Sequence, residues 1–321
     1  MVRYEFELDD LARTRFAISP MWETAAAIRV LRNPSLISLH LPWVKRIRSW
    51  IKELDLSLAL ALLPRRGYMA DFLTPPPSTP LADFDDELEL VRTTSEAQIR
   101  NDVEILIASG NPRESLRPYL EDPTAAVASL SEVLAEFWRR ALEPDWPRVR
   151  ALLEADLLYR SRRLTEGGVT LLFSDLHPDV EWVDGGVEVA MRCSDHVELS
   201  GRGLLLVPSA FSCQCPSGMT ESPWQPTMIY PARGVGLLWE EAAAPSDALA
   251  KVLGRSRATL LSDLDAPRTT TDLAARLEMT PGGVSQHLSA LRDSGLVSSS
   301  RNGRQVLYCR SPLADELVAA G

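Results

Sequence analysis

Residues 268–310 constrain the fold more closely than any other part of this chain, because local signals for two helices and a pair of strands follow one another there. Thr270 lies in a run of threonines that supplies the hydroxyl favoured at a helix N-terminus. After a three-residue turn, Thr280 and the proline that follows it predict the start of a second helix. Gly295 is typical of the residue that ends such a helix. The pattern predicts a helix-turn-helix.

The second of these helices has one apolar face and one polar face. Val284, Leu288 and Leu291 recur at helical spacing, so we expect them to pack inward. The remaining faces carry short or forked hydrogen-bonding groups, on Ser285, Gln286, Ser289 and Arg292. Such a helix suits the roughly 12 Å major groove of DNA, where Gln286 would pair with adenine and a serine would read less selectively. Thr280 and the helix N-terminus suit a phosphate.

Residues 296–310 predict a strand hairpin directly after the second helix. Asn302 and Gly303 form a preferred tight turn. Arg301 and Arg304 flank this turn, and cations at such a tip can contact phosphate or enter the minor groove. We interpret the hairpin as the wing of a winged helix-turn-helix.

Three stretches carry a resemblance to a known family: residues 270–277 (TTDLAARL), 284–297 (VSQHLSALRDSGLV) and 303–308 (GRQVLY). Over about residues 246–321 the chain resembles the ArsR-type winged helix-turn-helix regulators. The resemblance implies a homodimer that pairs through the helices flanking the winged helix, on partly palindromic operator DNA. It also implies that an effector changes the affinity for DNA. By the match, residues 285–287 and Ser289 would face the DNA.

Spacing and resemblance together predict a DNA-binding set of nine residues: Thr270, Thr280, Ser285, Gln286, His287, Ser289, Arg292, Arg301 and Arg304. His287 has an alternative interpretation as a histidine that packs between helices. Metal-sensing relatives carry a Cys-x-Cys unit in the first helix of the pair, whereas residues 271–279 contain neither Cys nor His. We therefore expect neither a metal nor a cofactor.

The net charge of −10 at first argues against a nucleic-acid partner. The charge is unevenly distributed, however. Residues 245–321 hold 9 Lys and Arg against 8 Asp and Glu, and residues 280–310 hold four Arg against the single acid Asp293. The excess of acid therefore lies upstream, and the expected DNA contacts lie where the local charge is positive.

Residues 1–244 predict a mixed α+β regulatory or dimerisation region, which makes the whole chain α+β. Alternation predicts a strand at 2–8, and helical periodicity predicts helices at 9–18, 21–31, 44–63, 88–107, 125–142 and 146–164. A hairpin is expected around Gly185 and Gly186, with further strands of the same sheet at 204–207 and 228–230. The proline-rich residues 74–80 are a possible internal boundary or a stiff connector.

A short hinge at 241–246 leads into the DNA-binding domain, residues 245–321. The upstream region also resembles an uncharacterised domain that precedes winged helices in bacterial regulators, a resemblance that names no ligand. It rests on Asp10-Leu-Ala-Arg, Pro42-Trp43, Ala151-Leu-Leu-Glu-Ala-Asp and the segment 226–236.

Three further groups of residues suggest a ligand-binding or redox role, and each also has a purely structural interpretation. Cys213 and Cys215, with His177 and His196 nearby in sequence, suggest zinc or a redox switch, although packed thiols are the favoured interpretation. Four aromatic residues suggest an apolar ligand pocket or, more simply, core: Trp182, Trp224, Tyr230 and Trp239. The acidic run 83–89 suggests a divalent cation or, preferably, a solvated helix start.

The sequence thus favours a cytoplasmic homodimeric repressor, not an enzyme, whose partners are operator DNA, a second copy and an unidentified small-molecule effector. No signal peptide is apparent, and the apolar run 56–63 is far shorter than a membrane span. Three alternatives stay open: an N-terminal region that only dimerises or binds a protein, an enzyme fused to a regulator, and a thiol sensor.

Overall fold

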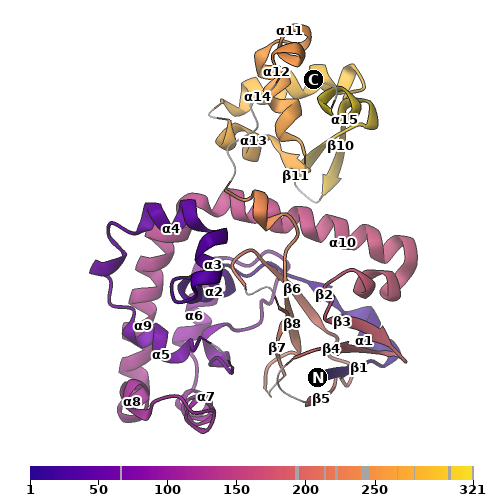
Figure 1. Ribbon diagram of the computed structural model, residues 1–321. Helices are drawn as coiled ribbons and strands as arrows, with labels where there is room; N and C mark the ends of the chain where they lie inside the picture. Colours follow the sequence, from indigo (N-terminus) through magenta and orange to yellow (C-terminus); the bar gives the residue numbers. More distant parts are fainter. Residues whose placement is uncertain are drawn as a thin grey trace. The chain divides into compact units, whose positions relative to one another are not determined.

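The computed structural model describes residues 1–65, 67–191, 195–212, 215–220, 223–239, 246–265, 267–277, 279–302 and 305–319. The chain divides into two compact units (Figure 1). The first consists of Met1–Pro144 and Asp156–Val235, and the second of Asp145–Ala155 and Gly236–Gly321. Among the described residues, no helix is long and apolar enough to cross a membrane.

The first unit contains a group of short helices: α1 (Leu8–Arg13), α2 (Pro20–Val30), α3 (Pro34–Leu39), α4 (Leu41–Ile47), α5 (Ser57–Leu62), α6 (Phe84–Arg92), α7 (Glu96–Ala108), α8 (Arg113–Glu121) and α9 (Pro123–Phe137). Single helical turns lie at Ile51–Glu53 and Asp71–Leu73, and a π-helical stretch, Trp138–Leu142, follows α9 and precedes the turn Glu143–Asp145. Helices α2 to α9 gather on one side of the strands of this unit (Figure 1).

Two of the expected helices are interrupted by local signals. The one expected at 44–63 is broken into α4, a single turn and α5. The one expected at 88–107 divides at Thr93, because Ser95 starts a new helix by accepting a hydrogen bond from the Gln98 N–H at 3.3 Å. The helix expected at 21–31 is confirmed as α2, which Ser19 caps through the Trp22 N–H at 2.9 Å.

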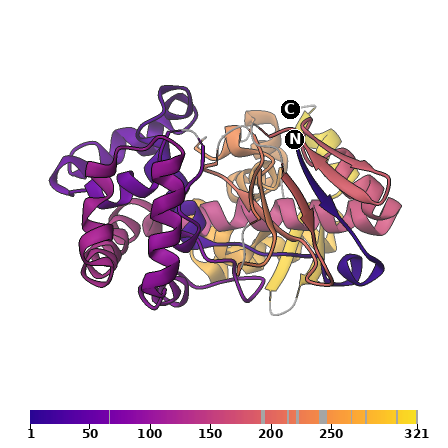
Figure 2. The same ribbon diagram turned by 90° about the horizontal axis from the view of Figure 1, so that it is seen from below.

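The strands of the first unit form two four-stranded sheets with one shared core. One sheet has the order β3 (Val180–Val183), β4 (Gly186–Val189), β1 (Val2–Glu5) and β5 (Asp195–Glu198). The other has the order β2 (Arg15–Phe16), β6 (Leu205–Ser209), β8 (Thr227–Pro231) and β7 (Ser217–Met219). Strand β1 is antiparallel to β4 and parallel to β5, so the beginning of the chain lies inside a sheet (Figure 2).

Three expectations for these strands need correction. The first strand ends at Glu5, and Leu8, expected on its buried face, begins α1 with 86% of its surface exposed. Helix α1 ends at Arg13 rather than at residue 18, because β2 follows it. Strands β6 and β8 pair with each other and not with the hairpin, so they belong to a different sheet.

The β3–β4 turn lies one residue earlier than expected. Its two central residues are Asp184 and Gly185, both with positive φ (47° and 78°), as a tight hairpin turn of the I′ type requires. Gly186 is already a strand residue that pairs with Glu5. A Cβ atom there would lie 2.7 Å from the Tyr4 carbonyl oxygen, so a close approach of two backbones requires this glycine.

The acidic run 83–89 is only partly a solvated helix start. Asp83 caps α6 by accepting from the Asp85 N–H at 2.9 Å, which fits that interpretation. Glu87, however, is 2% exposed and accepts the Met21 N–H at 2.8 Å, which places its carboxylate at the N-terminus of α2. Burial raises the pKa of Glu87 to about 8.

Helix α10 (Trp146–Ser174) consists of two helices that meet at the Gly167-Gly168 pair, so the first of them ends where we expected it to stop. Both glycines have non-helical dihedral angles, and Gly168 has a φ of 66°. A second, short helix follows this break, which we did not expect. It brings Leu172 and Phe173 into the core shared by the two sheets.

The second unit contains the elements of a winged helix: α11 (Asp247–Leu253), α12 (Arg255–Asp263), β9 (Arg268–Thr269), α13 (Thr270–Arg276), α14 (Pro281–Asp293), β10 (Val297–Asn302), β11 (Gln305–Arg310) and α15 (Pro312–Ala319). The sheet order is β10-β11-β9. Leucines of α12, α13 and α14 share a core with Leu296 and Tyr308. The mixed α+β class with a C-terminal winged helix is confirmed.

Candidate nucleic-acid interface

Helices α13 and α14 each begin at a threonine cap, and the cap of α13 is reciprocal. Thr269 is the N-cap of α13: its hydroxyl accepts the Asp272 N–H at 3.1 Å, and the Asp272 carboxylate accepts the Thr269 N–H at 3.0 Å. The run of threonines therefore caps the helix as expected, one residue before Thr270. Thr280 caps α14 by accepting the Gly283 N–H at 3.2 Å. Gly295, with a φ of 74°, follows the C-cap.

The inward face of α14 is the predicted apolar stripe. Val284 and Leu288 are fully buried and Leu291 is 1% exposed, within the core that also holds Leu273 of α13. This contact fixes the angle between the two helices, which lie next to each other (Figure 1). The opposite face of α14 is therefore fixed as the outward one.

The outward face of α14 carries the polar residues singled out in the sequence. Ser285, Gln286 and Arg292 are exposed, whereas His287 and Ser289 are half-buried. Ser285, Ser289 and Arg292 follow the spacing i, i+4, i+7, so they form one row on the helix surface. Gln286 lies beside this row near the N-terminal end. The amide and hydroxyl groups available for base edges are thus concentrated in the first half of the helix.

The hairpin β10–β11 is antiparallel, with Ser300 opposite Leu307 and Arg301 opposite Val306. Arg301 is exposed. Gly303 and Arg304, expected at the tip, lie outside the described residues. The third arginine of this region, Arg310, forms an ion pair with Asp315 at 2.9 Å, so its charge is locally balanced.

A buried ion-pair cluster in this unit was missed by the sequence analysis. Asp263 of α12 is 3% exposed and accepts two hydrogen bonds at 2.9 Å from the Arg276 guanidinium, one on each carboxylate oxygen. Arg268 donates through Nε to the Asp263 carbonyl at 2.8 Å. The cluster ties β9 and the end of α13 to α12. The available signal was the position of Asp263 among the leucines 260, 261 and 264, which form the apolar stripe of this helix.

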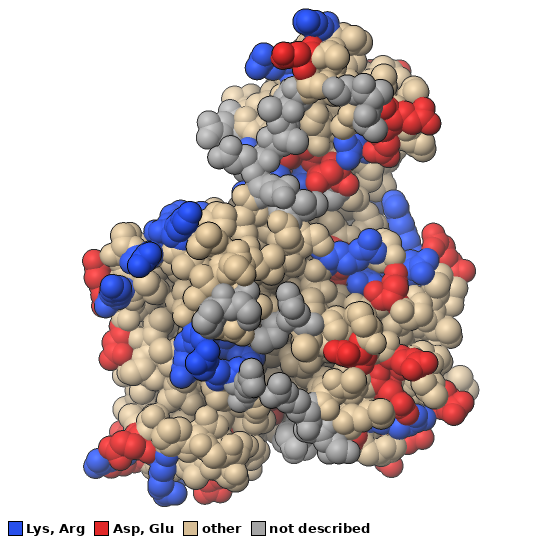
Figure 3. All heavy atoms as spheres, viewed as in Figure 1, with Lys and Arg blue, Asp and Glu red and all other residues tan. Residues whose placement is uncertain are grey.

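This cluster also divides the cations of the unit into two groups. Arg268, Arg276 and Arg310 are bound to carboxylates. Five cations are exposed among the described residues after 245: Lys251 on α11, Arg255 and Arg257 on α12, Arg292 on the outward side of α14 and Arg301 on the wing. Over the face drawn in Figure 3, Lys and Arg lie among Asp and Glu in both units. Exposed positive charge available for phosphate therefore lies on α11 and α12 as well as on α14 and the wing.

The cysteine and histidine hypothesis concerns residues of the first unit. Cys213 lies outside the described residues, and Cys215 is exposed and not in a disulfide. His177 accepts the Asp179 N–H at 3.0 Å, and His196 pairs with Glu5 at 2.8 Å. Within the described part of the chain, no three His, Cys, Asp or Glu residues gather as metal ligands.

The four aromatic residues proposed for a pocket do not lie together. Trp182 packs against Phe6 and Phe173, with ring centroids 5.3 and 5.7 Å away, in the core of the first unit. Tyr230 is fully buried and donates to Asp156 at 2.8 Å. These two are core residues. Trp224 lines an open pocket of the first unit, whereas Trp239 belongs to the second unit.

Comparison with known proteins identifies the helix-turn-helix. Residues 259–299, which cover the second half of α12, all of α13 and α14 and the start of β10, match the family model of the bacterial regulatory proteins of the ArsR family. No curated protein and no solved structure matches the chain. The segment upstream of residue 259 has no family match, as the resemblance to an uncharacterised domain led us to expect.

Proposed function

We propose, from the ArsR-family helix-turn-helix at residues 259–299, that this chain is a homodimeric transcriptional repressor that binds a specific operator. The family match assigns a DNA-binding regulator domain to the second unit. The observation that carries the specific proposal is the outward face of α14. There, Gln286 is exposed opposite the buried apolar stripe, and Ser285 is exposed on the flank of the same helix.

We assign base reading to Gln286, with Ser285 and Ser289 as less selective neighbours in the major groove. We assign phosphate contacts to Thr270 and Thr280 at helix N-termini, to Arg292 on α14 and to Arg301 in the hairpin, together with Arg304, which lies outside the described residues. His287 is half-buried, so it completes the set as a residue that both packs and approaches the DNA.

Exposed apolar side chains on the flanking helices support a homodimer. Val252 of α11 is 78% exposed, and Leu313 and Leu317 of α15 are 55% and 37% exposed. Large apolar side chains gathered on two helices of a small unit are characteristic of an interface. Pairing through these helices would present two α14 helices to two half-sites of a partly palindromic operator.

The regulatory region of the proposal is residues 1–244, and residues 245–321 are the DNA-binding domain. An effector bound upstream would change repression only if it bound the DNA-competent state and its alternative with different affinity. The proposed mode of repression is occlusion of the promoter. The proposed location of the protein is the cytoplasm.

The test is binding of the full-length protein to its own promoter and to a scrambled duplex of equal length, over a range of salt concentrations. We expect a preference for the promoter, and affinity for both duplexes that falls as salt rises. Equal affinity for the two duplexes would contradict sequence-specific binding. Sedimentation of the protein–promoter complex tests the dimer: one protomer per operator would refute it.

A further inference from the structure

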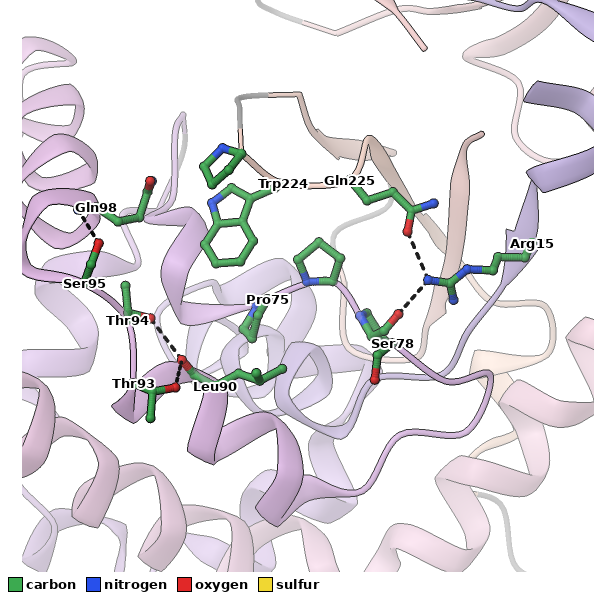
Figure 4. A pocket seen from close by; sticks show the side chains of 13 residues that line it. Arg15, Pro75, Ser78, Leu90, Thr93, Thr94, Ser95, Gln98, Trp224 and Gln225 are labelled. Atoms are coloured by element: carbon green, nitrogen blue, oxygen red, sulfur yellow. Dashed lines mark hydrogen bonds between the residues drawn. The ribbon is translucent and has the colours of Figure 1, made fainter. Parts of the chain in front are cut away.

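The first unit contains an open pocket that the DNA-binding proposal does not use (Figure 4). Its volume is about 660 Å³, within the range of small-molecule sites. Pro75, Pro76 and Pro77 line it, together with Leu90 of α6 and Trp224 from the segment before β8. Figure 4 shows the Trp224 indole beside the prolines, with Arg15 on one side and Ser95 and Gln98 on the other.

Two hydrogen-bond donors of the lining have no acceptor. The Arg15 Nη2 donates to the Pro77 carbonyl at 2.9 Å and to the Gln225 Oε1 at 3.0 Å. Arg15 Nη1 and Trp224 Nε1 are both out of contact with solvent and lack an acceptor among the described residues. A donor in that condition costs about 1–3 kcal/mol, and more when it is charged. Burial also lowers the pKa of Arg15.

The polar side chains on the α6–α7 side of the pocket already have hydrogen-bond partners. The Thr93 hydroxyl donates to the Glu89 carbonyl at 2.8 Å, and the Thr94 hydroxyl donates to the Leu90 carbonyl at 3.1 Å. Ser95 accepts the Gln98 N–H, and the Gln98 side chain donates to Asp102 at 2.7 Å. The lining therefore presents apolar rings, and its two unfilled donors lie just beneath the surface of the pocket.

The charge of the lining has one sign. Of the thirteen lining residues, Arg15 is the one cation, and none is Asp or Glu. Among the described residues no carboxylate lies within ion-pair distance of Arg15, whose acceptors are both uncharged. An anion with an apolar body would thus meet a complementary cation and complementary walls.

We propose that this pocket binds a small organic acid with a flat apolar body, its carboxylate held by Arg15 and its ring against Trp224 and the prolines. These groups define the chemical class of the ligand. The apolar rings disfavour strongly hydrated ions, and the positive charge of Arg15 repels amines, which are cationic. Binding itself does not depend on the proposed function. The step from binding to regulation rests on it.

The test is calorimetric titration of the full-length protein with benzoate, 2-naphthoate and indole-3-acetate, and with 2-naphthylmethylamine as the cationic counterpart. We expect at least one of the acids to bind and the amine not to bind. If none of the three acids binds up to about 5 mM, or the amine binds equally well, the proposal is wrong.

Two variants place the binding in this pocket. Trp224→Ala removes the indole ring that would pack against the apolar body of the acid, so we expect affinity to fall about 5- to 10-fold. Leu90→Glu, at a side chain that is 46% exposed, adds a negative charge at the rim and should weaken binding at least as much. The matched control is Leu164→Glu on α10, 41% exposed and outside the lining. Equal affinity of the Leu90 and Leu164 variants would place the ligand elsewhere and overturn the proposal.

The same samples distinguish failure of the ligand site from failure of the proposed function. Promoter affinity measured with and without the bound acid shows whether ligand binding is coupled to DNA binding. If an acid binds and promoter affinity is unchanged, only the proposal that this site regulates DNA binding is refuted. A protein that binds the acid and shows no preference for its promoter removes the proposed function and leaves the site in place.

Discussion

Replacing Asp263 with asparagine tests whether the buried ion pair holds the helix-turn-helix together. The change keeps the size of the side chain and one oxygen acceptor, and it removes the charge that faces Arg276. The carboxylate is 2% exposed and the Arg276 side chain 11%, so solvent screens the pair very little. Breaking a buried pair by removing one partner costs about 3–5 kcal/mol. Because asparagine keeps one acceptor, we expect the lower end, about 3 kcal/mol.

The matched control is the same substitution at Asp293. Its carboxylate lies 3.8 Å from Arg292 and is 74% exposed, so its loss should change stability by less than about 0.5 kcal/mol. Hydrogen exchange of the full-length protein, read by mass spectrometry on peptides from α13 and α14, reports on this unit alone. A loss of 3 kcal/mol corresponds to roughly 100-fold faster exchange in Asp263→Asn. If the two variants exchange at similar rates, the buried pair does not stabilise these helices.

Three further predictions concern DNA reading and pH. Gln286→Ala should bind the promoter and its single-base variants with nearly equal affinity, a loss of about 1–3 kcal/mol in discrimination; an unchanged preference would show that another residue reads the bases. Arg301→Ala should weaken binding to promoter and scrambled DNA alike and reduce the salt slope by about 1, whereas Arg162→Ala, an exposed arginine of the first unit, should leave the slope unchanged. Glu87 holds its proton from its ordinary pKa of 4.5 up to about 8 in the folded state, so the folded state should lose stability as pH rises through that window. Glu87→Gln should reduce the fall in Tm between pH 5 and pH 8, and identical pH profiles for the two proteins would refute this.

The winged helix could be predicted in detail because each of its signals is local. The Thr280 cap, the stripe of Val284 and Leu288 and the Gly295 stop all lie within one helix and specify its inward face without any distant partner. The proposed DNA contacts of α14 lie on the exposed faces of the same helix. They remain predictions, because they depend on how α14 enters the groove of the DNA.

The first unit could not be predicted to the same degree because its partners are far apart in sequence. Strand β1 pairs with residues 186–189 and 195–198, and nothing in residues 2–5 indicates which strands those are. Glu87 follows three acids that cap or begin a helix, and only the position of α2 explains why it is buried. The pocket likewise joins Arg15, the prolines and Trp224, of which the sequence had singled out Trp224 alone as a candidate for a pocket.

The position of β1 has a consequence for synthesis on the ribosome. Strand β1 lies between β4 and β5 in its sheet, and these strands end at Val189 and Glu198. About 180 further residues must therefore be made after β1 before it has either neighbour, and loop closure over such a length is slow. In the interval its two edges are unpaired, which favours aggregation or binding by a chaperone. The second unit, whose helix-turn-helix and wing are contiguous in sequence, has no such delay.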